Sequence, residues 1–191
     1  MTLRDKLPEL AVEAVMVVFA VTAALAADAW RENRQMQEFA ERAREAVMVE
    51  ARANLETFEN TGPALDTMQA MLAEVLRRPD PGNSSLDLDF ELPEASTAAW
   101  RAAQTSQAAA YLDYDWVVEV GRTYEVVEAY EAVSTGLIDA MGGIIASSIG
   151  ASLDPATLRT VFGRLTVLTD IHGQAEDRLR DIVAAEGSAD R

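Results

Sequence analysis

The chain has 191 residues, with 32 acidic and 16 basic side chains, a single histidine and no cysteine. The lack of cysteine excludes disulfides, thiolate zinc sites and cysteine nucleophiles. A net charge of -16 argues against nucleic acid as a partner, because affinity for phosphate backbones depends on clustered lysine and arginine. Alanine is abundant, with 34 residues, and this favours closely packed helices over sheets. We therefore predict an all-α protein.

An apolar stretch near the N-terminus, residues 10–29, predicts a transmembrane helix in a lipid bilayer. Trp30 follows it and is followed at once by charged residues, as is typical of a side chain that marks the headgroup layer. We therefore predict an uncleaved anchor, with Trp30 as its interface residue. Two alternatives stay open. Ala24-Leu25-Ala26 has the small-x-small form of a signal-peptide cleavage site, and a central helix of a soluble bundle can also lack a polar face.

Three residues of this span are candidates for contact with another membrane helix. Glu13 lies about one turn inside the apolar segment, where a charge is costly unless it snorkels to the boundary or finds a partner. Ala20 and Ala24 form a small-xxx-small pair, which lets a second helix approach closely. Snorkelling of Glu13 is the simpler alternative.

The charges flanking the span bear on its orientation. Two basic residues, Arg4 and Lys6, precede it, and four follow within the next 15 residues: Arg31, Arg34, Arg42 and Arg44. Counted alone, these charges would keep the following domain in the cytoplasm by the positive-inside rule.

The remainder of the chain has the apolar spacing of amphipathic helices. We predict an N-terminal segment with the transmembrane helix at 1–29, an antiparallel, coiled-coil-like bundle of four or five helices at 30–186, a loop at 79–93 and a polar tail at 187–191. Thr61-Gly62-Pro63 predicts an interruption of the first helix, and a single kinked helix is an equally good interpretation.

Helix starts are predicted at two places. Asp113 can cap a helix whose apolar stripe is rich in aromatic residues, and Asp154-Pro155 combines an N-cap with proline at the first helical position. The first of these helices is expected to end after about Ile145, because glycines recur there. The aromatic stripe is interpreted as core, with a ligand pocket as the alternative. Its members are Trp116, Val117, Val120, Tyr124, Val127 and Tyr130.

The last helix has a heptad-like seam. Its two rows are Leu158, Leu165, His172 and Leu179, and Val161, Leu168, Ala175 and Ile182. His172 has Glu176 four residues on, but one histidine and one glutamate do not make a metal site. We expect His172 to be a register-setting or a partly exposed core residue. The seam serves either the interior of the bundle or a partner.

Residues 86–92 alternate apolar and acidic side chains. We expect an extended strap whose apolar side lies on the bundle. A calcium site is the alternative, although the segment lacks the glycine turn of an EF-hand loop.

Two stretches carry a resemblance to known proteins. Glu13 in an apolar span leading to residues 27–34 (ADAWRENR), and residues 99–104 (AWRAAQ) continuing through Tyr111 and Tyr124, resemble an uncharacterised bacterial family of small membrane-anchored helical proteins. The resemblance covers about residues 5 to 130. It implies an N-terminal transmembrane helix with its N-terminus inside, and hence a bundle on the periplasmic side of the bacterial inner membrane. It implies no activity.

Two classes of function follow. The first is a membrane-anchored interaction or scaffold protein that associates with another protein or with itself, and the second is a small-molecule-sensing bundle around Trp100, Trp116 and Tyr124. An enzyme is not expected, because no phosphate loop, nucleophile elbow or metal-ligand set occurs. No catalytic residue, metal site or cofactor is therefore predicted.

Overall fold

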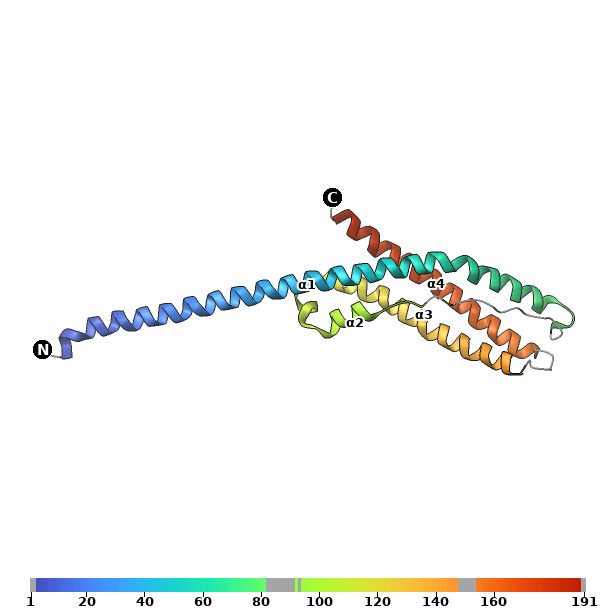
Figure 1. The fold of residues 1–191 in the computed structure, drawn as a ribbon, viewed down its shortest axis with the longest axis horizontal. Helices are drawn as coiled ribbons and strands as arrows, with labels where there is room; N and C mark the ends of the chain where they lie inside the picture. Colours follow the sequence, from blue (N-terminus) through green and yellow to red (C-terminus); the bar gives the residue numbers. More distant parts are fainter. Residues whose placement is uncertain (1–2, 82–91, 93, 148–153, 190–191) are drawn as a thin grey trace.

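The computed structural model describes residues 3–81, 92, 94–147 and 154–189, and within these ranges the protein is all-helical. Its elements are α1 (Leu3–Arg77), α2 (Ala98–Thr105), the 3-10 helix η2 (Gln107–Tyr111), α3 (Tyr114–Ser147) and α4 (Pro155–Ala189). The first part of α1 projects alone, and its second part packs beside α3 and α4 (Figure 1). The all-helical prediction is thus confirmed.

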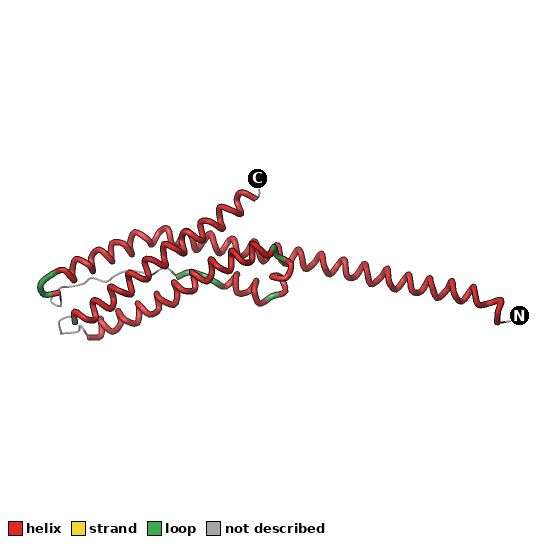
Figure 2. Tube along the Cα trace, turned by 180° about the vertical axis from the view of Figure 1, so that it is seen from behind, coloured by secondary structure: helices red, strands yellow, loops and turns green. Residues whose placement is uncertain are grey.

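Helix α1 is drawn without a break in Figure 2, and its bounds include Pro63. A proline inside a helix costs about 3 kcal/mol, because it removes one backbone hydrogen bond and its ring meets the preceding turn. Phe58 and Leu65, on either side of it, are buried, and burying one such side chain contributes about 1.5–3 kcal/mol. Because packing on both sides of Pro63 offsets its cost, the helix continues through residues 61–63, where the sequence had also allowed an interruption.

The main core lies between α1, α3 and α4. Cross-helix contacts run in opposite order along α1 and α4: Arg44 meets Glu186, Thr61 meets His172 and Gln69 meets Thr166. The buried members of this core include both rows of the predicted α4 seam except Ile182, which is partly buried. The seam is therefore occupied within the chain and is not available as a surface for a partner.

A second, smaller core lies where α2 packs on α1 and α3. Trp100 stacks on Tyr124 with 5.7 Å between ring centroids, and Val47, Ala103 and Val120 complete the cluster. The two cores together bury four members of the aromatic stripe of α3, as expected for a stripe that faces the core: Val120, Tyr124, Val127 and Tyr130. This second core stabilises the end of the bundle nearest the projecting part of α1.

The predicted helix starts are confirmed. The Asp113 carboxylate accepts a hydrogen bond from the Trp116 amide at 2.9 Å, and the Asp154 carboxylate accepts one from the Thr157 amide at 3.0 Å. Helix α3 ends at Ser147, close to the expected end, and α4 continues to Ala189, into the expected polar tail. Of the predicted strap, residues 86–91 lie outside the described residues, and Leu92 packs against the main core.

Candidate functional site: the exposed span and its junction with the bundle

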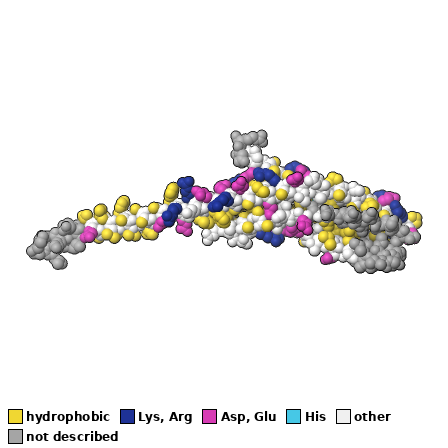
Figure 3. Space-filling model, viewed as in Figure 1, with side chains coloured by type: hydrophobic (Ala, Val, Ile, Leu, Met, Phe, Trp, Pro, Cys, Tyr) yellow, Lys and Arg dark blue, Asp and Glu magenta, His cyan; other side chains and the backbone are white. Residues whose placement is uncertain are grey.

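The projecting part of α1 is an apolar rod that no other described part of the chain covers. Every side chain from Val12 to Gln35 is exposed, and Phe19 is 71% exposed. Figure 3 shows this part as a narrow, largely apolar shaft that ends at a group of basic and acidic side chains. The Thr22 hydroxyl donates to the Val18 carbonyl at 2.7 Å, so the hydroxyl is satisfied within the helix. Among the described residues, α1 is the one helix long and apolar enough to cross a membrane.

The three candidate contact residues share one face of the rod. Successive residues of an α-helix are about 100° apart around its axis, so Glu13, Ala20 and Ala24 lie within a sector of roughly 40°. All three side chains are exposed. The structure therefore places them together on one surface of the rod and leaves all three side chains exposed.

That face points away from the bundle. By the same geometry, the α1 residues buried in the bundle lie roughly 180° around the axis from Glu13. These residues include Ala40, Val47, Ala51 and Phe58. Further along α1, the residues on the Glu13 side are exposed: Glu38, Val49, Glu56 and Thr67. A second helix lying on this face would therefore not collide with α3 or α4.

The opposite face of the rod has a different shape. A shallow apolar groove is lined by Ala14, Val15, Val18, Phe19 and Thr22. It lies on the side of α1 that faces the bundle further along. This face supplies matched control positions for any test of the Glu13 face.

Trp30 marks the end of the apolar rod. Its ring is 65% exposed, and the Arg34 guanidinium lies 5.9 Å from the ring centroid. Arg31 pairs with Asp28 and Arg34 with Glu38, each at 3.1 Å. Such exposed pairs contribute little to stability, but they keep the charges of this junction in mutual contact.

Beyond the junction, Glu50 of α1 fastens α2 to the bundle. Its carboxylate accepts hydrogen bonds from the Ser96 hydroxyl at 2.7 Å, the Ala99 amide at 2.9 Å and the Tyr124 hydroxyl at 2.9 Å. The Trp100 amide donates to it at 3.3 Å. Thr97, at the N-cap position of α2, makes no side-chain cap, so Glu50 supplies from another helix the acceptor that the first turn of α2 needs. Burial, and then the charge of Glu50, raise the pKa of Tyr124.

Asn54 completes this fastening one turn along α1. Its side-chain amide donates to the Ser96 carbonyl at 2.7 Å and accepts from the Ser96 amide at 2.9 Å. Asn54 is 3% exposed, and both of its polar atoms are satisfied. We call Glu50 and Asn54 the α2 clasp. The clasp was missed from sequence, although a signal existed: Asn54 occupies a position of the apolar stripe between Ala51 and Phe58.

The C-terminal end of α4 is held at the same end of the bundle. Arg44 donates two hydrogen bonds to Glu186, at 3.1 and 2.8 Å, and its guanidinium lies 5.2 Å from the Trp116 ring centroid. The hydrogen bond that Arg44 donates to Glu186 raises the pKa of Arg44. Both side chains are largely shielded, so this pair is stronger than the exposed pairs near Trp30.

The described residues contain no group of three or more His, Asp or Glu side chains able to hold a metal ion. His172 and Glu176 lie together as their spacing suggested, and His172 is buried among aromatic side chains.

No family model matches the chain, and neither does any curated protein or solved structure. The resemblance to the bacterial membrane-anchored family therefore stays a prediction.

Trp100, Tyr124 and Tyr130 are each at most 5% exposed. Trp100 and Tyr124 stack on each other, and Tyr130 packs on Phe58 at 4.9 Å between centroids. Their rings are in contact with protein atoms, as a core requires. This arrangement favours the core interpretation of the stripe over a pocket for a small molecule.

Proposed function

We propose that the protein is a single-pass membrane-anchored helical interaction or scaffold protein, non-catalytic, and a subunit of a larger membrane assembly. Its location is the bacterial inner membrane, with an antiparallel bundle domain on the periplasmic side. The observation that carries the proposal is the wholly exposed apolar rod of α1, which continues without a break into the packed bundle. An exposed apolar surface of this size needs a membrane or protein partner.

The association part of the proposal rests on the face that carries Glu13, Ala20 and Ala24. Small residues let a second membrane helix approach, and a carboxyl within hydrocarbon gains from a polar partner. The orientation of this face supports the same assignment, since it points away from α3 and α4 along all of α1. The α4 seam is already occupied, so the membrane-spanning face remains as the surface for a partner.

Anchoring is tested by the intact mass of protein extracted from native membranes and by extraction with alkaline carbonate. We expect the mass to include the apolar rod and the protein to stay with the membrane. A mass beginning at Ala27, or full release by carbonate, would refute the anchor.

Association is tested by crosslinking and co-purification in mild detergent. We expect Glu13→Leu, and the double variant Ala20→Leu with Ala24→Leu, to lose most of the crosslinked species. The matched control is Val18→Leu with Thr22→Leu, on the opposite face, and it should behave as wild type. If all variants insert and recover the same species, the membrane helix is only an anchor. If wild type is a monomer without partners, the association proposal is wrong.

A further inference from the structure

The one histidine of the chain lies in the main core, where α1, α3 and α4 meet. His172 is 3% exposed, and its ring centroid lies 4.9 Å from that of Phe58 on α1 and 5.9 Å from that of Tyr130 on α3. It occupies a seam position on α4 where the neighbouring seam residues are apolar. The ring is therefore part of the packing between three helices.

Helix α1 approaches this ring closely because residue 62 is glycine. A Cβ atom at Gly62 would lie 3.3 Å from Cε1 of His172, closer than an ordinary van der Waals contact. The imidazole thus occupies the space that a side chain on α1 would otherwise fill. A shift of the ring toward Gly62 would therefore press on α1.

The ring has few polar partners. Nε2 lies 3.5 Å from Oγ1 of Thr61, whose hydroxyl donates to the Thr57 carbonyl at 2.7 Å. The Phe58 carbonyl also faces the ring, and the Tyr130 hydroxyl has no hydrogen-bond partner among the described residues. One long contact and one carbonyl are few partners for a buried cation, which carries two N–H donors.

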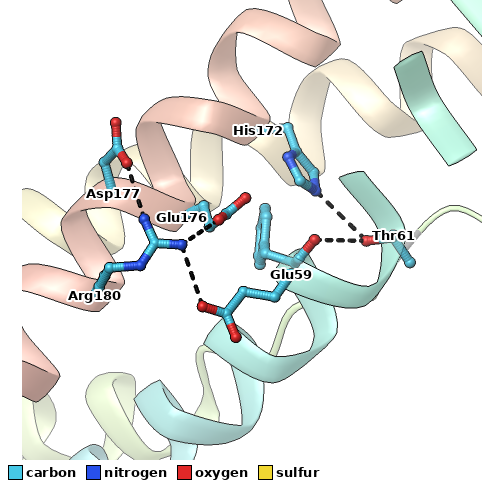
Figure 4. A network of polar contacts seen from close by, with 7 residues as sticks. Glu59, Thr61, His172, Glu176, Asp177 and Arg180 are labelled. Carbon is cyan, nitrogen blue, oxygen red and sulfur yellow. Dashed lines mark hydrogen bonds and ion pairs between the residues drawn. The ribbon is translucent and has the colours of Figure 1, made fainter. Parts of the chain in front are cut away.

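The two carboxylates that act on the ring lie on α4 and on α1. On α4, Glu176 pairs with Arg180, which also pairs with Asp177 and with Glu59 of α1, both at 3.2 Å (Figure 4). On α1, Asp66 acts on the ring through its charge. On α3, the group facing the ring is the neutral phenol of Tyr130. Burial lowers the pKa of His172, and Glu176, the Phe58 carbonyl and Asp66 oppose it.

We propose that His172 is an acid-sensitive latch: protonation of its ring loosens the packing of α1 against α4. Well above about pH 6.5 the ring is neutral in both the folded and the unfolded chain, so it adds no pH dependence there. As the pH falls below that value, the unfolded chain binds the proton first, and the folded state loses stability until the pH passes the lowered pKa of the folded ring. In the folded protein, the protonated ring competes with Arg180 for the carboxylate of Glu176.

The test uses the full chain in lipid nanodiscs. Because the chain has no cysteine, Asn60→Cys on α1 and Gln174→Cys on α4 give two unique, exposed labelling sites. Pulsed electron-paramagnetic-resonance distances between spin labels there are measured from pH 7.5 to 5. The imidazole resonance of the single histidine, followed by NMR, gives the pH at which the ring is protonated. We expect the distance distribution to widen with the same midpoint as the histidine titration.

Two non-titrating variants, His172→Leu and His172→Gln, provide the comparison. We expect their distances to stay constant over this range, and their folded-to-unfolded ratio to fall less than that of wild type. A wild-type distance that stays constant while the histidine resonance titrates would overturn the proposal, whether or not the variants fold. Equal pH dependence in wild type and both variants would also overturn it.

Discussion

Replacing Glu50 with alanine is expected to be among the most destabilising single changes outside the main core. The carboxylate has four donors, and two of them are shielded from water: the Tyr124 hydroxyl and the Trp100 amide. A buried donor left without its partner costs about 1–3 kcal/mol, and the lost interaction with the first turn of α2 adds about 0.3–1 kcal/mol. The exposed Ser96 hydroxyl regains water at little cost.

We therefore expect Glu50→Ala to lower the free energy of unfolding by about 3 kcal/mol. This value is near the low end of the summed costs, because some water will solvate the donors that lose Glu50. For a protein of this size, that corresponds to a fall in melting temperature of about 6–12 °C. Glu50→Gln keeps one acceptor oxygen, so about half of this loss is expected. The measurement is thermal unfolding of the full chain in detergent micelles, followed by circular dichroism.

The control is Glu56→Ala, an exposed glutamate on the same helix. It should change the unfolding free energy by no more than about 0.5 kcal/mol. A loss in Glu50→Ala that is below about 1 kcal/mol, or no larger than that of the control, would refute the role given to the clasp.

Four further substitutions test other contacts. Tyr130→Phe removes a buried hydroxyl that has no hydrogen-bond partner in the described part of the chain, so thermal unfolding should show a neutral or stabilising effect. A loss above about 1 kcal/mol would contradict this. Gly62→Ala should destabilise, because its methyl group would press on the imidazole facing it, whereas Gly173→Ala meets nothing within 4 Å and should stabilise by up to about 1 kcal/mol. Arg44→Ala should cost about 1–2 kcal/mol in urea unfolding by leaving Glu186 shielded and unpaired, and equal stability with wild type would argue against that pair.

Much of the helical framework could be predicted because its signals are local. The caps at Asp113 and Asp154 and the α4 seam depend on residues within one or two turns, and the structure confirms them. The passage of α1 through Pro63 could not be decided locally, since it depends on the packing of Phe58 and Leu65 against other helices. The local cost of proline and the distant gain from burial are of similar size, which is why both interpretations stayed open.

The candidate site was predictable in part, for the same reason. The spacing of Glu13 and Ala20 is enough to put them on one face of a helix. The direction of that face relative to the bundle becomes known only when the structure shows which residues of α1 are buried. The Glu50 half of the clasp could not be found from the sequence, because Glu50 and Trp100 are 50 residues apart and a glutamate on a helix usually faces water. Arg44 and Glu186, 142 residues apart, were hidden by the same separation.

The absence of a break in α1 has a mechanical consequence. From Trp30 to Arg77 the helix extends for about 70 Å, at 1.5 Å per residue, and α4 packs along it. The helix therefore acts as a lever arm whose short end is the apolar rod. A change of about 10° in the tilt of that rod would swing the far end of the bundle by about 12 Å, and membrane helices tilt over a range of about 40°. A modest reorientation of the rod by lipid thickness or by a neighbouring helix would thus become a large displacement at the other end of the protein.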